Sequence, residues 1–252
     1  MIEKNGVEAM KVLDHGYVRM EDAMGNDLTT VNAAKASFAR RAEEFKPGHE
    51  KLVNFLGENE HTSPFRHSVM TFEVSAPMFV KNQWWKYVVG HMHDPMQAWN
   101  ESSRRYVTDE PEFYVPQWRR APEDKKQGSG DFFGPNDVTV TENTVGQPYG
   151  EYREANTSNL LTGRMDQAIA QGIATYNWAM DLGVAPEQAR VFLPAYALYV
   201  KWWWTCSLQG ALHLIEQRTA PDAQWEFQEY ARVIEYMVQL KFPVATRAYL
   251  GR

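Results

Sequence analysis

The sequence predicts an α+β protein built from an antiparallel sheet and several helices. Residues 10–14 and 17–21 flank His15-Gly16 and are expected to form two short strands joined by a hairpin turn. Met70, Phe72 and Val74 alternate with polar residues, which is the period of a half-buried strand. Apolar stripes at helical spacing occupy much of the remaining chain. With 252 residues, the chain suits one large domain or at most two small ones, and we predict a single domain over residues 1–252.

Three helices are expected in the first half of the chain. Asp27 follows Gly25-Asn26 and is a candidate cap for the first helix. A second helical segment follows Pro47-Gly48. Pro77 suits the start of a third helix, in which Gln83 and Lys86 lie one turn apart on the face opposite the apolar stripe. These two side chains are therefore able to reach the same ligand.

The second half of the chain begins with a segment of a different composition. Residues 123–158 are polar and rich in glycine, which predicts a long surface loop or flap. A helical stripe then ends at Gly183, and a short helix that carries Arg190 follows it. The aromatic segment 196–217 is expected to be a buried helix with Gln209 and His213 along a polar face. A last helix is expected over about residues 222–240.

The composition excludes several classes of protein. Nine Trp, twelve Tyr and twelve Phe disfavour disorder, and a formal net charge of −6 disfavours general binding to nucleic acid. The single cysteine, Cys206, excludes an internal disulfide, fits a reducing cytoplasm and is expected to be a small core residue. The first residues lack the apolar stretch of a signal peptide, and the most apolar run, 192–208, contains Pro194 and Lys201. We therefore expect a cytoplasmic protein with no membrane partner.

Residues 100–106 carry the densest set of hydrogen-bonding groups, with the sequence Asn-Glu-Ser-Ser-Arg-Arg-Tyr. Such a concentration suits recognition of a planar, charged small molecule, although a solvated turn next to a strand explains it equally well. The two histidines at 61–67 have neither the helical spacing nor the cysteine partner that would support a metal site, and the short His/Asp loop at 91–94 is of a kind that is usually solvated. We therefore predict a small-molecule site and no metal.

With Gln83-Trp84-Trp85 just upstream, the septet at 100–106 resembles the signature of the flavin-dependent thymidylate synthases. Several further segments resemble that family in the same order. They are 24–27, 33–38, the His-Thr-Ser-Pro-Phe run at 61–65, Lys126-Gln127-Gly128-Ser129, Arg190 before Leu193-Pro194, His213, Arg218 and 223–226. The similarity extends over most of the chain.

The resemblance implies a fold, an assembly and a reaction. The fold is an antiparallel sheet flanked by helices, in an obligate homotetramer whose active sites are shared between subunits. The reaction is methylation of dUMP to dTMP, with methylenetetrahydrofolate as one-carbon donor and with FAD, reduced by NADPH, as the hydride source. No enzyme nucleophile attacks the pyrimidine in this scheme, which agrees with a structural role for Cys206.

The resemblance also assigns residues to each ligand. The dUMP contacts it implies are Gln83, Lys86, Glu101, Ser102, Ser103, Arg105, Arg190 and Arg218. The FAD contacts are Ser37, Ser63, Lys86, Tyr87, Ser207, Gln209 and His213, with His61 near the flavin or the folate. Arg105 is expected on the phosphate, and Arg218 is expected on the pyrimidine edge as the catalytic residue. Ser102 matches a variable position, where only the backbone takes part.

The sequence departs from the family pattern around the flavin. The family's Arg-His-Arg is Lys86-Tyr87-Val88 here, and Ser207 and Gln209 stand where many members have Asn and Arg. About seven extra residues fall within 90–99, where His91 or His93 is a candidate replacement for the lost flavin contacts. Two alternatives therefore stay open: a related flavin-dependent enzyme that makes another C5-modified pyrimidine, and a dUMP-binding regulator that has lost the flavin.

Overall fold

The computed structural model describes residues 2–4, 7–89, 97–107, 109–123, 128–143 and 151–251. The chain forms two compact units. Unit 1 is made of Met1–Ser103 and Tyr199–Arg252, and unit 2 is Arg104–Leu198. Unit 1 is thus assembled from both ends of the chain. Among the described residues, no helix is long and apolar enough to cross a membrane.

Unit 1 contains a six-stranded sheet in which every neighbouring pair of strands is antiparallel, as predicted. Two of the strands, β3 and β4, include the predicted strand segments at 17–21 and 70–74. In spatial order the strands are β1 (Ile2–Lys4), β2 (Val7–Val12), β3 (Gly16–Met24), β4 (Val69–Pro77), β8 (Tyr199–Ser207) and β5 (Ala98–Glu101). The sheet therefore joins segments from both ends of the sequence.

The strand β8 corrects the first half of the helix predicted over residues 196–217, whereas the second half is helical, as predicted. Its residues alternate between the two faces of the sheet, so that Trp202, Trp204 and Cys206 are buried while Lys201 and Trp203 are exposed. Each of its residues pairs with a residue of β4, for example Trp204 with Phe72. Aromatic side chains suit a pleated surface that is covered on one face, and here that preference prevails over the helical interpretation. The expectation that Cys206 is a small core residue is confirmed.

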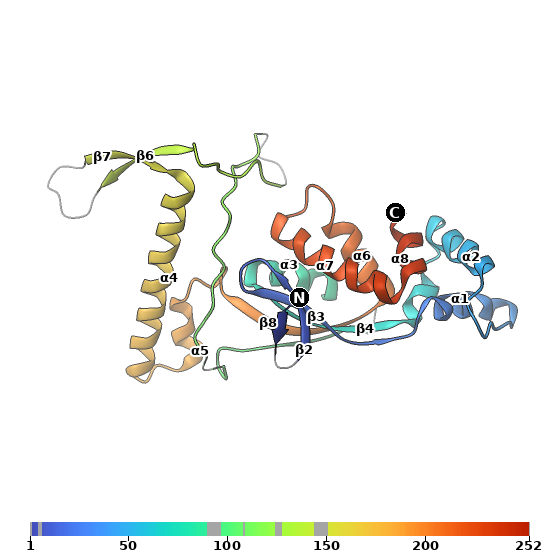
Figure 1. Cartoon of the computed structure of the whole chain (residues 1–252). Coiled ribbons are helices and arrows are strands. Elements are labelled where there is room, and N and C mark those ends of the chain that lie inside the picture. The colour runs from blue at the N-terminus through green and yellow to red at the C-terminus, as the bar shows by residue number, and fades with distance from the viewer. Residues whose placement is uncertain are drawn as a thin grey trace. The chain divides into compact units, whose positions relative to one another are not determined.

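Three helices cover one face of this sheet: α3 (Met78–Val89), α6 (Leu208–Arg218) and α7 (Trp225–Lys241) (Figure 1). Trp84 on α3 is fully buried and contacts the rings of Trp202, Trp204 and Phe227, with centroid distances of 5.4, 5.4 and 5.2 Å. These large rings bury most of their area between sheet and helices. The core therefore fixes α3 and α7 against the sheet, and α3 and α6 each carry three of the candidate site residues.

A second group of helices in unit 1 comprises α1 (Asp27–Lys35), α2 (Pro47–Glu58) and α8 (Pro243–Leu250), with the 3₁₀ helix η1 (Ala36–Phe38) after α1. Asn26, and not Asp27 as predicted, caps α1, because the Asn26 side chain accepts from the N–H groups of residues 28 and 29. The buried Asp27 carboxylate instead accepts from the N–H groups of Val244 and Ala245, at 3.0 and 2.8 Å, at the start of α8. The helix α2 packs closely on α8, since a Cβ added at Gly57 would lie 2.2 Å from the carbonyl oxygen of Ala248.

Unit 2 contains a hairpin of β6 (Val138–Asn143) and β7 (Glu151–Asn156), then α4 (Thr157–Asp181), α5 (Pro186–Ala189) and the 3₁₀ helix η3 (Arg190–Phe192). The described part of residues 123–158 is therefore a hairpin in large part, whereas the sequence predicted a loop. Where the structure describes their side chains, the two strands bury little surface, so they do not need an apolar face. Their mostly polar sequence therefore shows little of the alternation of apolar and polar residues by which a strand is predicted.

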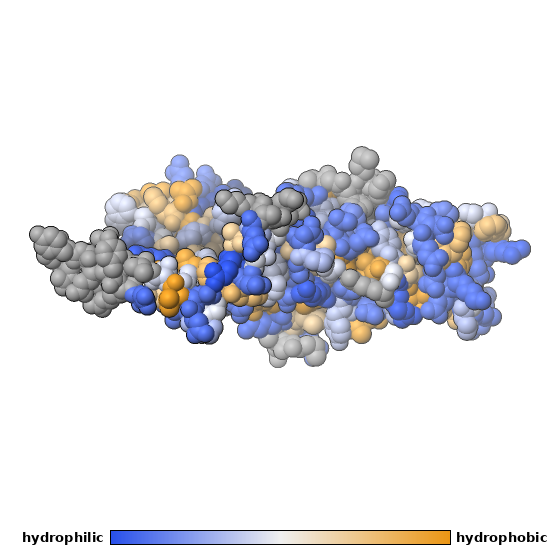
Figure 2. Space-filling view, turned by 90° about the horizontal axis from the view of Figure 1, so that it is seen from above, coloured by the Kyte–Doolittle hydropathy of each residue, from blue (hydrophilic) through white to orange (hydrophobic). Residues whose placement is uncertain are grey.

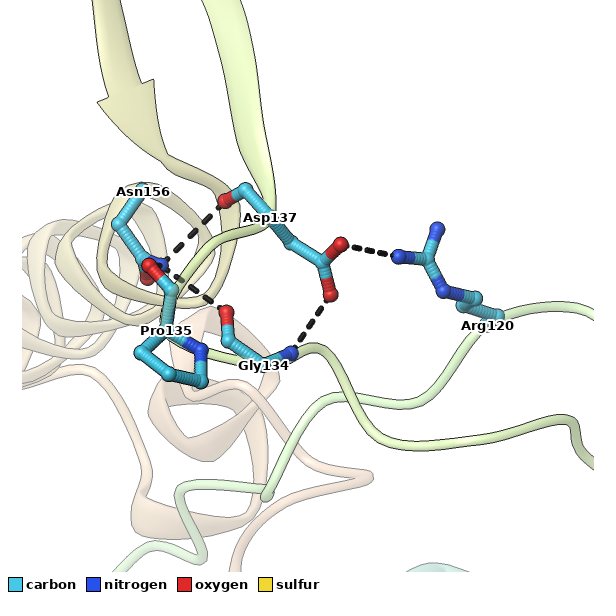
Figure 3. Close-up of polar contacts among 5 residues, drawn as sticks. All are labelled: Arg120, Gly134, Pro135, Asp137 and Asn156. Carbon is cyan, nitrogen blue, oxygen red and sulfur yellow. Dashed lines mark hydrogen bonds and ion pairs between the residues drawn. The ribbon is translucent and has the colours of Figure 1, made fainter.

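A network of polar contacts closes the base of this hairpin (Figure 3). The Asp137 carboxylate accepts from the Gly134 N–H at 2.6 Å and from the Arg120 guanidinium. The Asn156 amide donates to the carbonyl oxygens of Gly134, Pro135 and Asp137 at 3.0 to 3.3 Å, and its oxygen accepts from the Asn159 N–H in the first turn of α4. The hairpin and α4 are thus joined at one residue.

Candidate functional site

The side chain of Arg218, at the last residue of α6, is the centre of the candidate site in unit 1. Its Nε donates to the Tyr87 hydroxyl at 2.6 Å, and its Nη1 lies 3.5 Å from the Gln83 side-chain oxygen. The guanidinium also lies over the rings of Tyr87 and Phe227, with centroid distances of 5.1 and 5.2 Å. The structure therefore brings together Gln83 and Arg218, which were predicted to contact dUMP, and Tyr87, which was predicted to contact FAD.

Gln83 is itself held in place by a chain of hydrogen bonds that starts on α7. The Gln83 amide donates to the side-chain oxygen of Gln224, and the Gln224 amide donates to the Glu226 carboxylate at 3.1 Å. Glu226 is only 2% exposed. This chain of hydrogen bonds from a buried side chain fixes the orientation of both amides, so that the Gln83 oxygen points to Arg218. Sequence reasoning matched residues 223–226 to the family but did not predict this positioning role.

The ring of Tyr87 lies next to Arg218 and also contacts His213. Tyr87 lies between Arg218 and His213, and its ring centroid is 5.8 Å from that of the imidazole. Burial raises the pKa of the Tyr87 phenol, and the nearby Arg218 guanidinium offsets only part of this rise. The phenol is therefore neutral at physiological pH and acts as a hydrogen-bonding group beside the arginine.

The opposite end of α6 holds a second arginine. Arg66 lies in the 3₁₀ helix η2 (Ser63–His67); its Nε donates to the Gln209 side-chain oxygen at 2.6 Å and its Nη2 donates to the Thr62 hydroxyl at 3.2 Å. Gln209 is 5% exposed, whereas the predicted flavin contacts Ser63 and His61 are exposed on either side of Thr62. Arg66 thus links the 61–65 loop, through Thr62, to Gln209.

Ser207 and His213 are the other predicted flavin residues on β8 and α6. The Ser207 hydroxyl is buried and accepts from the Gly210 N–H at 3.1 Å, so it caps α6. His213 is partly exposed one helical turn beyond Gln209. Ser37 is exposed at the end of α1, in η1, and Lys86 is exposed on α3.

The septet at 100–106 begins at the end of β5 and continues into a turn. The Glu101 carboxylate forms an ion pair with Lys81 at 2.9 Å. The backbone N–H of Ser102 donates to the Lys201 carbonyl at 2.8 Å, and its hydroxyl accepts from the Lys201 N–H at 3.1 Å. These bonds extend the pairing of β5 with β8 and hold the start of the septet, including the partly buried Ser103, at the sheet edge.

Two predicted phosphate-binding arginines lie in unit 2, so they belong to a different unit from Arg218. Arg105 is exposed, and its guanidinium lies 5.1 Å from the centroid of the Tyr106 ring. Arg190 is also exposed, and its Nε donates to the Glu187 carbonyl oxygen at 3.2 Å. The candidate flavin contacts His91 and His93, and the Lys126-Gln127 pair, lie outside the described residues.

The hydrogen-bond donors and aromatic rings of the candidate site fit a flat ligand that carries negative charge. Arg66 and Arg218 are partly buried, and each is bonded only to neutral groups within the described part of the chain. A partly buried cation without a carboxylate partner favours an anion or a developing negative charge. Together with the faces of Tyr87 and Phe227, these groups match the requirements of a flavin nucleotide and a pyrimidine nucleotide. Over the same described residues, no group of three or more His, Cys, Asp or Glu is arranged to hold a metal.

The comparisons with known proteins identify the family that this chain resembles. The family model described as "Thymidylate synthase complementing protein" matches residues 19–244. The flavin-dependent thymidylate synthase of Thermosipho africanus is 31% identical over 243 residues, which cover 95% of this chain and 93% of the relative. That of Thermus thermophilus is 30% identical over 246 residues, which cover 97% of this chain and 79% of the relative.

The fold is similar to that of a solved structure, the UMP/dUMP methylase PolB from Streptomyces cacaoi bound with 5-Br dUMP. The TM-score is 0.74 and the sequence identity is 23%. The match covers 96% of this chain and 97% of that chain. The likeness confirms the predicted α+β fold class, in which an antiparallel sheet is flanked by helices.

Proposed function

Because the chain belongs to the family of thymidylate synthase complementing proteins, the flavin-dependent thymidylate synthases, we propose that it methylates C5 of dUMP to give dTMP. The one-carbon donor is methylenetetrahydrofolate and the final reductant is NADPH. One carbon and one hydride pass to the pyrimidine, while the C5 proton leaves. The products are dTMP, tetrahydrofolate and oxidised nicotinamide dinucleotide phosphate.

The observation that carries this proposal is the state of Arg218. Its guanidinium is held by Tyr87 and Gln83, and it makes no carboxylate contact within the described residues. The charge of this side chain is therefore available to a ligand. Placed against the carbonyl edge of a uracil ring, it stabilises the negative charge that builds on the ring as C5 reacts. Preorganisation by Tyr87 and Gln83 means that little reorganisation is needed during the reaction.

The nucleotide is bound by groups that suit a planar base and a dianionic phosphate. We assign the base to Gln83 and Arg218, and the phosphate to Arg105 and Arg190, because guanidinium groups bind phosphate through two parallel hydrogen bonds. Lys86 adds a positive charge on α3. Glu101, Ser102 and Ser103 complete the assignment at the edge of the sheet, where Ser102 takes part through its backbone.

The flavin is assigned to the region along α6 and its neighbours. Ser37, Ser63, Tyr87, Ser207, Gln209 and His213 would hold it, with Lys86 and His61 close by. When bound, the reduced FAD supplies the hydride and the path for the one-carbon unit. The protein contributes alignment: the ring of Tyr87 offers a flat surface, and its neutral phenol keeps Arg218 directed at the substrate.

We also propose that the chain forms a homotetramer whose sites are shared between subunits. Exposed apolar side chains at the C-terminal end of α4 and in η3 support an assembly: Trp178 is 61% exposed, Leu182, the residue after α4, 63% and Val191 74%. Figure 2 shows one face of the molecule, where hydrophobic residues form separate patches among hydrophilic ones. Exposed apolar side chains that lie together on a surface commonly mark a site of protein–protein contact. Light scattering of the purified protein measures the assembly directly, and a monomer would contradict it.

Product analysis with isotopically labelled dUMP tests the proposed reaction. The purified protein should be yellow, with the absorbance of an oxidised flavin, and should convert dUMP to dTMP when methylenetetrahydrofolate and NADPH are present. A yellow protein that makes a different C5-modified product would replace the proposal with a related enzyme. A colourless protein that binds dUMP without converting it would be a regulator.

A further inference from the structure

Arg66 is a charged residue that the proposed function does not use. Its side chain is partly buried, and its two hydrogen-bond acceptors are the Gln209 amide oxygen at 2.6 Å and the Thr62 hydroxyl at 3.2 Å. Both acceptors are neutral. Arg66 makes no ion pair with any described residue, whereas the buried Arg19 pairs with both Glu21 and Glu73. An unneutralised, partly buried guanidinium is a site for an anion.

Gln209 holds this guanidinium at the first turn of α6. Gln209 is 5% exposed and its side-chain oxygen accepts from Arg66, so burial restricts the position of the amide. The Arg66 Nη1 has no acceptor among the residues that the structure describes. Arg66 is therefore held through one edge, and a donor is left for a ligand. The start of α6 adds the partial positive charge of the helix dipole.

The position of Arg66 relative to Arg218 indicates the class of ligand. Gln209 and Arg218 are nine residues apart on α6, which is about 14 Å along the helix axis. His213 lies between them on the helix and contacts the Tyr87 ring. A ligand that lies along α6 would thus have a flat ring near Tyr87 and His213 and an anionic group near Arg66. A flavin nucleotide has this combination of a tricyclic ring and a phosphate chain.

We propose that Arg66 binds a phosphate group of the flavin nucleotide, with Gln209 and Thr62 as the groups that position it. This inference rests on the proposed function, because it places a flavin in the site. It adds a phosphate contact that comes from η2, and it gives Gln209 the role of positioning that contact.

The test compares flavins that differ only in their phosphates. Protein freed of bound flavin is titrated with FAD, FMN and riboflavin, and binding is followed by the quenching of flavin fluorescence. Arg66→Gln should weaken FAD binding about ten- to hundred-fold, the range for a lost charge-assisted hydrogen bond, and should leave riboflavin binding within about two-fold of wild type. Lys51→Gln, which removes the same charge from an exposed position on α2, should change neither.

A second variant moves the charge instead of removing it. Because Arg66 and Gln209 are in direct contact, the exchange Arg66→Gln with Gln209→Arg keeps a guanidinium beside the first turn of α6. We expect it to recover most of the lost FAD affinity. Circular dichroism and thermal melting establish that each variant is folded. If Arg66→Gln does not fold, Arg66→Lys, which keeps the charge, replaces it in the flavin titrations.

Four results would overturn the inference. Equal losses for FAD and riboflavin would show that Arg66 supports the ring or the fold and not a phosphate. Unchanged FAD binding together with weaker dUMP binding would assign Arg66 to the substrate phosphate. Wild-type protein that binds no flavin at all would refute the proposed cofactor as well, whereas normal flavin binding by wild type and Arg66→Gln alike would refute the inference alone.

Discussion

Replacing Tyr87 by phenylalanine removes one hydroxyl from the candidate site and leaves the aromatic ring in place. The hydroxyl accepts the 2.6 Å hydrogen bond from Arg218 Nε. After the substitution, Arg218 keeps its contacts with the two aromatic faces and the longer 3.5 Å contact with Gln83. The change therefore tests the orientation of the arginine and not its presence.

The expected magnitude follows from these contacts. A hydrogen bond to a charged group contributes roughly 1.5–3 kcal/mol, and we take the lower end because Arg218 is partly exposed. About 1.4 kcal/mol corresponds to a tenfold change in rate. We expect kcat to fall about tenfold while the KM for dUMP changes less than about threefold, because the charge of Arg218 stays and only its alignment is lost. Arg218→Ala should cost more, on the order of 2–4 kcal/mol of transition-state stabilisation.

Steady-state kinetics of wild type, both single variants and the double variant form the assay. If Tyr87 acts through Arg218, Tyr87→Phe should have no further effect once Arg218 is alanine. Effects that add fully would refute the positioning role, and so would a Tyr87→Phe enzyme with wild-type turnover. Because burial raises the pKa of the phenol, the ratio of wild-type to variant kcat should stay constant from pH 6 to about pH 9, where Tyr87 remains neutral.

Three further predictions concern other parts of the chain. Arg105→Ala should weaken dUMP binding by roughly 1.5–3 kcal/mol in calorimetric titrations, and unaltered binding would contradict its phosphate role. Gly57→Ala should lower the free energy of unfolding in urea by about 1–3 kcal/mol, because the added Cβ would lie 2.2 Å from the Ala248 carbonyl oxygen, while Gly48→Ala, where nothing lies within 4 Å, should have little effect. The Gly134 N–H and Arg120 hold the pKa of the Asp137 carboxyl below its ordinary value, so its carboxylate stabilises the hairpin base above about pH 4 and this contribution is lost as the pH falls through the lowered pKa. Asp137→Asn should therefore speed amide hydrogen exchange in β6 and β7 relative to wild type at pH 7, and a difference of the same size well below that pKa would count against this explanation.

The sequence predicts the periodic elements of the fold well and fails where tertiary pairing decides. The strand β4 and the helices α3 and α7 follow from apolar spacing, because one face of each packs on the core. The strand β8 does not, since its three consecutive tryptophans mask the alternation between buried and exposed positions. Its partner β4 lies more than a hundred residues earlier in the chain, so local sequence carries no signal of the pairing.

The sequence also predicts only part of the candidate site, because some of its contacts join residues that are far apart in the chain. Gln83, Tyr87, His213 and Arg218 meet in unit 1, and their motifs or helical spacing identified them. The contact of Arg66 with Gln209 joins residues that are 143 positions apart, and a lone arginine in a polar loop does not reveal whether its partner is a carboxylate, an amide or water. The placement of Arg105 and Arg190 relative to Arg218 stays a prediction.

The discontinuous sheet of unit 1 has a consequence for how the protein is made. During synthesis, β3 and β4 leave the ribosome early, yet the inner edge of β4 can pair with β8 only after residue 207 has emerged. Until then the nascent chain exposes an unpaired strand that carries Met70, Phe72 and Val74, the kind of edge that promotes aggregation. Expression at a lower temperature, or together with chaperones that bind unfolded chains, should therefore raise the yield of folded protein. Substitutions in the hairpin of unit 2 should raise this yield less.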